Sequence, residues 1–349
     1  MKADAVSTLS GREILRTALA RNQKQLNQTL SEFSSGRHAD VGLTLGNRLG
    51  SVLDMRQVQG NLTTLTATNG VVAARLGTIQ SSLDGIRKLA DGLVETALAV
   101  RQSGADSKLL VADAQSRLGS IFEMLSVTTD GVYVFGGINV STPPMDDYLS
   151  DPPGPARSAV IAAFTAEFGF APDDPQVSTI TPAQLEAYID GPFADLFSDP
   201  AWGASFSSAS DGVMRDRISL GEEIDTSATT NDAGFRKLYA AMALAIDSGI
   251  ENMTAETRQV LSNRIVASAT SASYDFVHIQ SVTGMAQERL AQANERISIE
   301  TQALQRRVSA AEEIDPYEVA EQLGLLMSRL EASYSVTSRI QQLSLMNYL

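Results

Sequence analysis

Two histidines and two pairs of neighbouring aspartates are the side chains in this sequence that could do chemistry. His38 and His278 have no cysteine partner, because the chain contains no cysteine, and no second histidine at the spacing of a metal site. The pairs Asp146–Asp147 and Asp173–Asp174 lack the alternating oxygen ligands of a calcium-binding loop. We expect the histidines to be structural or surface residues and the aspartates to lie in solvated loops.

Motifs of catalysis and cofactor binding are also missing from the sequence. It holds no phosphate-cradling glycine loop, no nucleophile elbow and no HExxH helix. We interpret four Asn-x-Ser/Thr sequons as chance matches in a chain rich in serine and threonine; they lie at Asn27, Asn61, Asn139 and Asn252. The sequence therefore predicts no metal site, no cofactor and no catalytic residue, and a protein that is not an enzyme.

Charge and hydropathy exclude two classes of partner. A formal net charge of -14 without a visible basic face argues against binding to nucleic acid. No apolar run approaches the roughly eighteen residues that span a bilayer, so we expect no membrane insertion. Residues 18–20 imitate a signal-peptidase site, but Arg12, Glu13 and Arg16 occupy the place of the apolar core that should precede it. We expect an uncleaved N-terminus and, if the protein leaves the cell, a route that needs no removable signal.

An amphipathic helix is predicted at the N-terminus. Ser10 and Glu13 form a capping box, which places the helix start there and leaves residues 1–9 outside it. Gly36 suits the left-handed position that ends a helix. Between these signals, apolar residues recur at spacings of three and four and therefore share one side of the helix. They are Leu15, Leu19, Leu26, Leu30 and Phe33.

A second amphipathic helix is predicted at the C-terminus. Asp315 can cap it, Pro316 suits its first position, and Glu318 completes an arrangement like a capping box. Its apolar stripe consists of Val319, Leu323, Leu326, Leu330, Tyr334, Ile340 and Leu343. Two interpretations stay open: the terminal helices pack on each other in an ordinary bundle, or their stripes are left for other chains. Because chain ends are usually frayed unless something ties them down, their regularity favours the second.

The sequence predicts that the middle of the chain consists of helices on both sides of an insertion. Long helices are predicted over 54–101 and from the turn at 103–107 to the turn at 130–131, and a strand over 132–135. A strand over 214–220 and helices from 232 and 254 onward, the last interrupted near Gly284, mirror this order. Ten of the eleven prolines lie between Pro143 and Pro200, so we interpret 138–212 as an insertion of loops and short strands, with one short helix opened by Thr181 and Gln184.

These elements predict a mainly α protein. A long antiparallel helical hairpin or bundle, formed by both chain termini, carries a small inserted α+β domain at its tip. The expected division is 1–40 with 316–349 as terminal helices, 41–137 with 213–315 as a helical bundle with a short β segment, and 138–212 as a proline-rich, acidic surface domain.

Three stretches carry a resemblance to a known family. They are Phe-Ser-Ser-Gly-Arg at 33–37, Tyr-Val-Phe-Gly-Gly at 133–137, and Gln-Leu-Ser-Leu-Met-Asn-Tyr-Leu at 342–349. Together with opposed terminal helices, they resemble the bacterial flagellin superfamily. The last stretch is similar to the hook–filament junction proteins (hook-associated protein 3) more than to flagellin itself.

The resemblance implies a structural subunit of the bacterial flagellum. Such proteins leave the cell unfolded through the flagellar type III apparatus with an export chaperone. They then fold as a ring or helical homo-oligomer between another hook-associated protein and flagellin. The resemblance further implies that the terminal helices form an inner coiled coil, with the twelve apolar residues of the two stripes as its assembly interface, and that the protein is extracellular.

Two alternatives remain. The first is flagellin, the filament subunit, which differs from a junction protein in copy number. The second belongs to another class: a secreted, adhesin-like binding protein that acts through its central domain. The sequence does not show which ligand residues 138–212 would contact.

Overall fold

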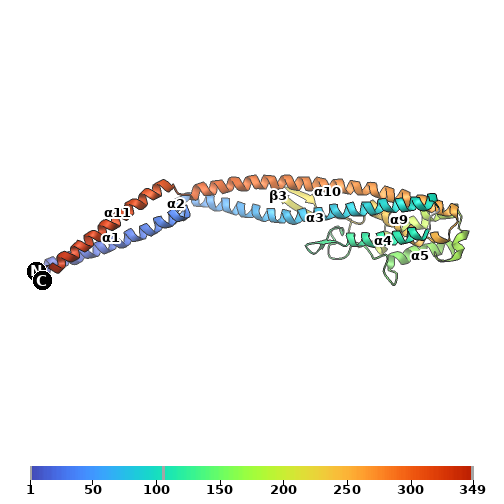
Figure 1. Cartoon of the computed structure of the whole chain (residues 1–349), viewed down its shortest axis with the longest axis horizontal. Helices are drawn as coiled ribbons and strands as arrows, with labels where there is room; N and C mark the ends of the chain where they lie inside the picture. The colour runs from blue at the N-terminus through green and yellow to red at the C-terminus, as the bar shows by residue number, and fades with distance from the viewer. Residues whose placement is uncertain (1, 104–106, 347–349) are drawn as a thin grey trace. The chain divides into compact units, whose positions relative to one another are not determined.

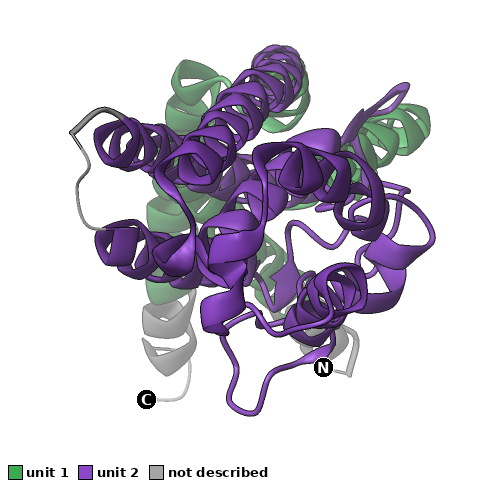
Figure 2. Ribbon diagram, turned by 90° about the vertical axis from the view of Figure 1, so that its right-hand side faces the viewer, with its two compact units in different colours: residues 1–63, 298–349 green, residues 64–297 purple. Residues whose placement is uncertain are grey.

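The computed structural model describes residues 2–103 and 107–346 and divides the chain into two compact units (Figure 2). Unit 1 combines residues 1–63 with 298–349, and unit 2 is the continuous stretch 64–297. Most described residues are helical, and the described strands form two small antiparallel sheets. The mainly α fold with a small β component is therefore confirmed.

Four long helices account for most of the chain: α1, α3, α10 and α11. In chain order the elements are α1 (Lys2–Ser35), α2 (Val41–Leu45), η1 (Gly46–Arg48), α3 (Leu49–Ser103), α4 (Ser107–Leu125), β1 (Thr128–Thr129), β2 (Val132–Tyr133), α5 (Pro155–Phe168), η2 (Pro175–Thr179), α6 (Pro182–Tyr188), η3 (Ile189–Phe193), α7 (Ala194–Leu196), α8 (Ala201–Ser205), β3 (Arg215–Ser219), β4 (Glu222–Asp225), α9 (Ala233–Asp247), η4 (Ile250–Asn252), α10 (Ala255–Glu312) and α11 (Pro316–Met346). Among the described residues, no helix combines the length and the apolar character needed to cross a membrane. The turn expected at 103–107 lies partly outside the described residues.

Unit 1 is built on α1 and α11, which lie side by side in opposite directions (Figure 1). Gly36 ends α1 with a φ of 69°, and its amide donates to the carbonyl oxygen of Glu32 at 2.8 Å. Oδ1 of Asp315 accepts a hydrogen bond from the amide of Tyr317 at 2.9 Å, and α11 begins between them at Pro316. The signals expected for the end of α1 and the start of α11 are both confirmed.

The start of α1 differs from the expectation. The helix begins at Lys2, well before the capping box at Ser10 and Glu13, so the expectation that the first residues lie outside it is wrong for 2–9. This stretch contains no proline, and Ala3 and Ala5 favour a helix. A capping pattern can begin a helix, but it does not end a helix that is already formed.

The core of unit 2 lies among α4, α9 and the parts of α3 and α10 that belong to this unit. Phe235, Leu238 and Met242 of α9 are completely buried in it. α10 runs unbroken through Gly284, so the expected interruption is wrong. A single glycine costs a helix about 1 kcal/mol relative to alanine, which the burial of core residues such as Phe276 on the same helix outweighs.

Two hairpins flank the insertion. β1 and β2 pair around Asp130 and Gly131, whose φ angles of 55° and 75° suit a tight two-residue turn. The strand expected over 132–135 is confirmed for Val132–Tyr133, whereas 134 and 135 form a turn. The returning strand expected over 214–220 is β3, which pairs with β4 in antiparallel register.

Residues 138–212 fold mainly into short helices, and the expected loops and short strands are a wrong interpretation of this segment. Pro155, Pro175 and Pro182 occupy the first turns of α5, η2 and α6, where proline begins a helix instead of breaking it. The capping box expected at Thr181 and Gln184 is confirmed. The density of prolines alone therefore pointed to the wrong secondary structure.

The insertion shares its core with the helical flanks. Phe164, Tyr188 and Trp202 belong to the same buried cluster as Phe235 and Leu238 of α9. The structure accordingly groups 138–212 with the rest of unit 2. The three-part division expected from the sequence stays a prediction.

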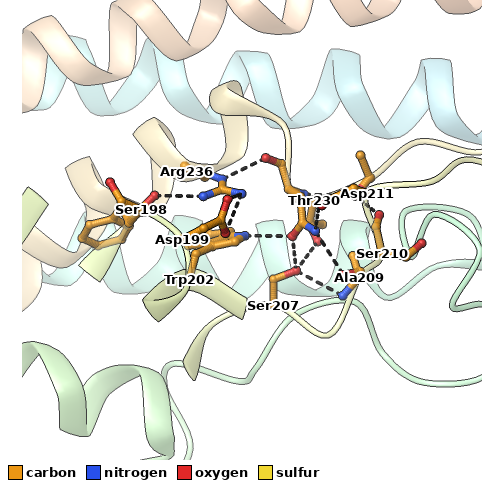
Figure 3. Close-up of polar contacts among 12 residues, drawn as sticks. Ser198, Asp199, Trp202, Ser207, Ala209, Ser210, Asp211, Thr230 and Arg236 are labelled. Carbon is orange, nitrogen blue, oxygen red and sulfur yellow. Dashed lines mark hydrogen bonds and ion pairs between the residues drawn. The ribbon is translucent and has the colours of Figure 1, made fainter. Parts of the chain in front are cut away.

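A polar junction around Asn231 also joins the insertion to the start of α9, and Figure 3 shows its partners Trp202, Ser207 and Arg236. Its side-chain oxygen accepts hydrogen bonds from Trp202 Nε1 at 3.0 Å and from Ser207 Oγ at 2.8 Å. Arg236 donates from Nε to the backbone oxygen of Asn231 at 2.8 Å, and its guanidinium lies over the Trp202 ring, 5.5 Å from the ring centre. Because these bonds join segments on both sides of β3 and β4, the insertion cannot be removed without exposing polar and aromatic groups on α9.

Candidate assembly surface on the terminal helices

The inner seam of unit 1 contains most of the predicted interface residues. We use this name for the sides of α1 and α11 that face each other. Val319 and Leu326 are 7% and 3% exposed, respectively. The half-buried members are Leu15, Leu19, Leu26, Leu323 and Leu330. Part of the predicted stripe is therefore covered within one chain, as the ordinary-bundle interpretation expects.

Polar groups interrupt the inner seam. Thr29 is almost completely buried in it, and its hydroxyl donates to the carbonyl oxygen of Gln25 at 2.9 Å. At the exposed edge of the seam, Gln23 Nε2 donates to the hydroxyl of Tyr334 at 2.9 Å. The seam is thus a thin layer of half-buried leucines and polar contacts, with far fewer fully buried apolar side chains than α9 has.

Three further predicted residues lie outside this seam. Leu30, Phe33 and Tyr334 are 44%, 49% and 48% exposed. The side chains of Ile340 and Leu343 lie outside the residues whose side chains the structure describes. The pairing of α1 with α11 therefore leaves large apolar side chains accessible on both helices.

A second apolar side of α11 escaped the sequence interpretation. Leu325 and Val336 are 54% and 46% exposed, and about three helical turns separate them, so they lie on one side of the helix. Adjacent residues differ by about 100° around a helix, which turns Leu325 away from the buried Leu326. We call this side the outer face of α11. The spacing of Leu325 and Val336 is visible in the sequence, but the longer stripe on the other side of the helix masked it.

Glu312, Arg56 and Arg37 form a cluster of ion pairs in unit 1, near the end of α1 and the beginning of α11. We call this cluster the charged clasp. The side chain of Glu312, the last residue of α10, is 1% exposed and accepts a hydrogen bond from Arg56 at 2.6 Å. Arg37 forms a second ion pair with it at 3.7 Å. Beside this carboxylate, the amide of Ile314 donates to the carbonyl oxygen of Gly36 at 3.2 Å. The clasp fixes the end of α1 against the beginning of α11.

The histidines take different positions. The backbone amide of the half-buried His38 donates to the carbonyl oxygen of Glu312 at 3.1 Å, so His38 belongs to the clasp. His278 is exposed on α10.

Carboxylates of both aspartate pairs support the local backbone. Oδ2 of Asp146 accepts from the amide of Ala156, and Oδ1 of Asp174 caps η2 through the amide of Gln176 at 2.8 Å. Within 2–103 and 107–346, no group of three histidine or acidic side chains is placed to hold a metal ion.

The strongest electrostatic feature of unit 2 is the buried carboxylate of Asp247, which sequence reasoning missed. Arg157 binds it with two nitrogens, with Nη2 at 2.8 Å from Oδ1, and the hydroxyl of Tyr148 donates to Oδ2 at 2.9 Å. Burial, followed by the charge and hydrogen bond of Asp247, raises the pKa of Tyr148 well above its usual value. The hydrogen bond to Asp247 likewise raises the pKa of Arg157. All three groups satisfy one another, so the cluster fixes α5 to α9.

Comparisons with known proteins agree with this architecture. The bacterial flagellin N-terminal helical region matches residues 6–140, and the bacterial flagellin C-terminal helical region matches residues 266–349. A search of curated proteins gives no significant match.

Among solved structures, the chain is similar to one from Vibrio parahaemolyticus whose description assigns it to the flagellar hook-associated proteins. The TM-score is 0.51 at 9% sequence identity, over 74% of this chain and 95% of that one. At this identity the likeness shows the fold. The two family matches cover both helical flanks and together more than half of the sequence. The chain therefore belongs to the bacterial flagellin superfamily and is a structural subunit of the bacterial flagellum.

Proposed function

We propose that this subunit joins the flagellar hook to the filament by assembly through its terminal helices. The observation that carries the proposal is the outer face of α11. Leu325 and Val336 stay exposed on it although the inner seam of the same helix is covered by α1. Covering these side chains with a neighbouring subunit would remove their apolar surface from water and stabilise the assembly.

The geometry supports a contact between unlike surfaces. The outer face of α11 carries Leu325 and Val336, whereas α1 exposes Ile14, Leu30 and Phe33. A contact that joins two different surfaces of identical subunits is heterologous, and it produces a closed ring or an open helix. Twelve apolar residues of the two stripes were predicted as the interface. In this proposal Leu30, Phe33 and Tyr334 contact neighbours directly, while the inner-seam leucines keep each helix pair together.

The same energetics support the proposed export. The inner seam of unit 1 buries few large side chains completely, and local structure with little buried apolar area opens at low free-energy cost. Terminal helices of this kind can pass unfolded through the flagellar type III apparatus with an export chaperone and pair after release. The partners at the assembly site are further copies, another hook-associated protein and flagellin, and the site is the extracellular hook–filament junction.

The resemblance of residues 342–349 to junction proteins favours the junction over the filament. Flagellin remains the second candidate, because both family matches describe flagellin regions and the same helix faces could build a filament. The two functions differ in what is lost when the protein is absent.

Electron microscopy of a strain that lacks the gene tests the junction function. A missing junction subunit leaves hooks without filaments, while flagellin is still exported and accumulates in the medium. A missing flagellin also leaves bare hooks, but that flagellin is then absent from the medium. Filaments of normal length on the hooks of the deletion strain would overturn both candidates.

A further inference from the structure

Unit 2 carries a surface of α3 on which exposed glycine and alanine stand where longer side chains would be expected. We call it the small face of α3, and it consists of Ala67, Gly70 and Ala74, with Val71 at its margin. Nothing lies within 4 Å of the position that a Cβ atom of Gly70 would take. Contacts inside the chain therefore do not require glycine there, although glycine costs a helix stability relative to alanine.

The small face also lacks charge. No Asp, Glu, Lys, Arg or His occurs from residue 57 to residue 74, although the chain has a formal net charge of -14. Exposed helix surfaces normally carry charged side chains opposite their apolar side. An exposed glycine on an uncharged helix surface permits the close approach of another backbone.

A complementary surface lies on α10 of the same unit. Tyr274, Val277 and Met285 are 74%, 43% and 61% exposed and share the outward side of the helix. We call them the apolar row of α10. His278 is the only residue with a titratable side chain from 276 to 287. The row therefore presents protruding apolar groups, with Asp275 beside Tyr274 and Glu288 one turn beyond Met285, whereas the small face offers room for such groups.

We propose that the apolar row of α10 in one subunit packs on the small face of α3 in a second copy of this chain. The inference rests on the proposed function, since it names the surfaces by which unit 2 joins neighbours during that assembly. Shape and polarity favour a second copy as the occupant: the protruding side chains of the apolar row fit the room that the small face offers, and Tyr274, Val277 and Met285 themselves bring no charge into the contact.

The two surfaces lie at different levels along the helices of unit 2. Asn69, next to Gly70, donates a hydrogen bond to Asn294 at 2.7 Å, and Asn294 lies well beyond the apolar row, which ends at Met285. At 1.5 Å per residue, the centres of the two surfaces are offset by roughly 20 Å along the axis. One copy must therefore be shifted along this axis relative to the next. Such a staggered, heterologous contact repeats from subunit to subunit instead of closing as a symmetric pair.

Disulfide cross-linking tests the contact without background, because the chain contains no cysteine. Full-length Gly70→Cys and Met285→Cys proteins are mixed under assembly conditions and oxidised. The mixture should form at least about tenfold more disulfide-linked dimer than either variant alone, since a specific contact raises the effective concentration of the two thiols. Thr68→Cys, on another side of α3, serves as the matched control with Met285→Cys and should stay near the level of single variants.

A second variant separates folding from assembly. Gly70→Gln adds a helix-favouring side chain where the free chain has open space, so the melting temperature of the free protein should rise by roughly 2 °C. The same side chain occupies the room needed by Met285 of the neighbour and should reduce assembly at least about tenfold, as expected when a core contact of an interface is blocked. Gly50→Gln, also at a helix glycine with open space, is the control and should assemble normally.

The outcomes separate the two proposals. Normal assembly without the Gly70→Cys to Met285→Cys cross-link overturns this contact and leaves the junction function in place. Unchanged assembly of Gly70→Gln also overturns the contact. Failure of the unmodified chain to assemble under any condition overturns both.

Discussion

Nη2 of Arg56 lies 2.6 Å from Oε1 of Glu312, and this contact joins the beginning of α3 to the last residue of α10. The carboxylate is 1% exposed, while the side chain of Arg56 is 50% exposed. Arg37 contributes the second ion pair, at 3.7 Å. The contact is thus asymmetric. The buried carboxylate of Glu312 is stabilised only by its protein partners, whereas both arginine side chains are half exposed and can be hydrated by water.

This asymmetry predicts unequal effects of removing the two arginines. Arg56→Ala removes the short hydrogen bond from a buried carboxylate and should cost about 1–3 kcal/mol of local stability. Arg37→Ala removes only the longer pair of an exposed side chain and should cost less than about 1 kcal/mol. The Ile314 amide donates a hydrogen bond to the carbonyl oxygen of Gly36, so its rate of hydrogen exchange reports the free energy of local opening at the clasp. Equal effects of the two variants would show that the difference in distance and solvation has no energetic meaning.

The two apolar sides of α11 predict opposite phenotypes for neighbouring leucines. Leu325→Asp changes an exposed position and should alter folding by less than about 0.5 kcal/mol, but it places a charge on the outer face and should stop assembly. Leu326→Asp puts a charge into the inner seam and should separate α1 from α11 at a cost of more than about 2 kcal/mol.

Circular dichroism and motility together resolve this pair of variants. Leu26→Asp, on the α1 side of the inner seam, should behave like Leu326→Asp, with unit 2 still folded. Normal motility of the Leu325→Asp strain would refute the role of the outer face.

The thin inner seam predicts that α1 and α11 are the first elements to open in the free protein. Amides within 13–35 and 316–339 should exchange with solvent at least about a hundredfold faster than those of α9, because buried apolar contacts set the free energy of local opening. Exchange should slow on assembly, when neighbours cover Leu30, Phe33 and the outer face of α11. Protection of both terminal helices equal to that of α9 in a dilute monomer would contradict the assembly proposal directly.

The parts of the fold that follow from local rules were predictable from the sequence. Asp315, Pro316 and Gly36 are signals that act through their nearest neighbours, and each one is confirmed. Most of the insertion was not predictable in the same way, because the position of a proline within a helix decides its effect, and Pro155 and Pro175 begin helices that were not expected.

Features that depend on distant residues left no signal in the sequence. Asp247 and Arg157 meet across ninety positions, and neither belongs to a local motif. The burial of Leu326 and the exposure of Leu325 also depend on which side of α11 meets α1. A single stripe can be read from spacing, but only the partner helix determines which stripe is covered.

Asp232, which precedes α9, predicts a pH dependence of stability. Burial raises the pKa of its carboxyl above the ordinary value of 3.8; Asp275 acts in the same direction, while His278 and Arg236 oppose it. The pKa of this carboxyl is therefore higher in the folded chain than in the unfolded chain. At a pH between the two values, the folded chain holds a proton that the unfolded chain has released. Stability is therefore lost as the pH rises from about 3.8 through the pKa of the folded chain. At neutral pH the carboxylate is charged, and its burial still lowers the free energy of unfolding.

Asp232→Asn isolates this effect. Asparagine caps a helix about as well as aspartate does, and it carries no charge to desolvate. The variant should be more stable than the parent at pH 7, and the difference should shrink towards zero as the pH falls below 3.8. Urea unfolding followed by the fluorescence of Trp202, the only tryptophan in the sequence, reports on this region, because Trp202 bonds to the adjacent Asn231. A variant that is less stable than the parent at pH 7, or a difference that stays constant with pH, would show that the buried charge of Asp232 is favourable or irrelevant to the fold.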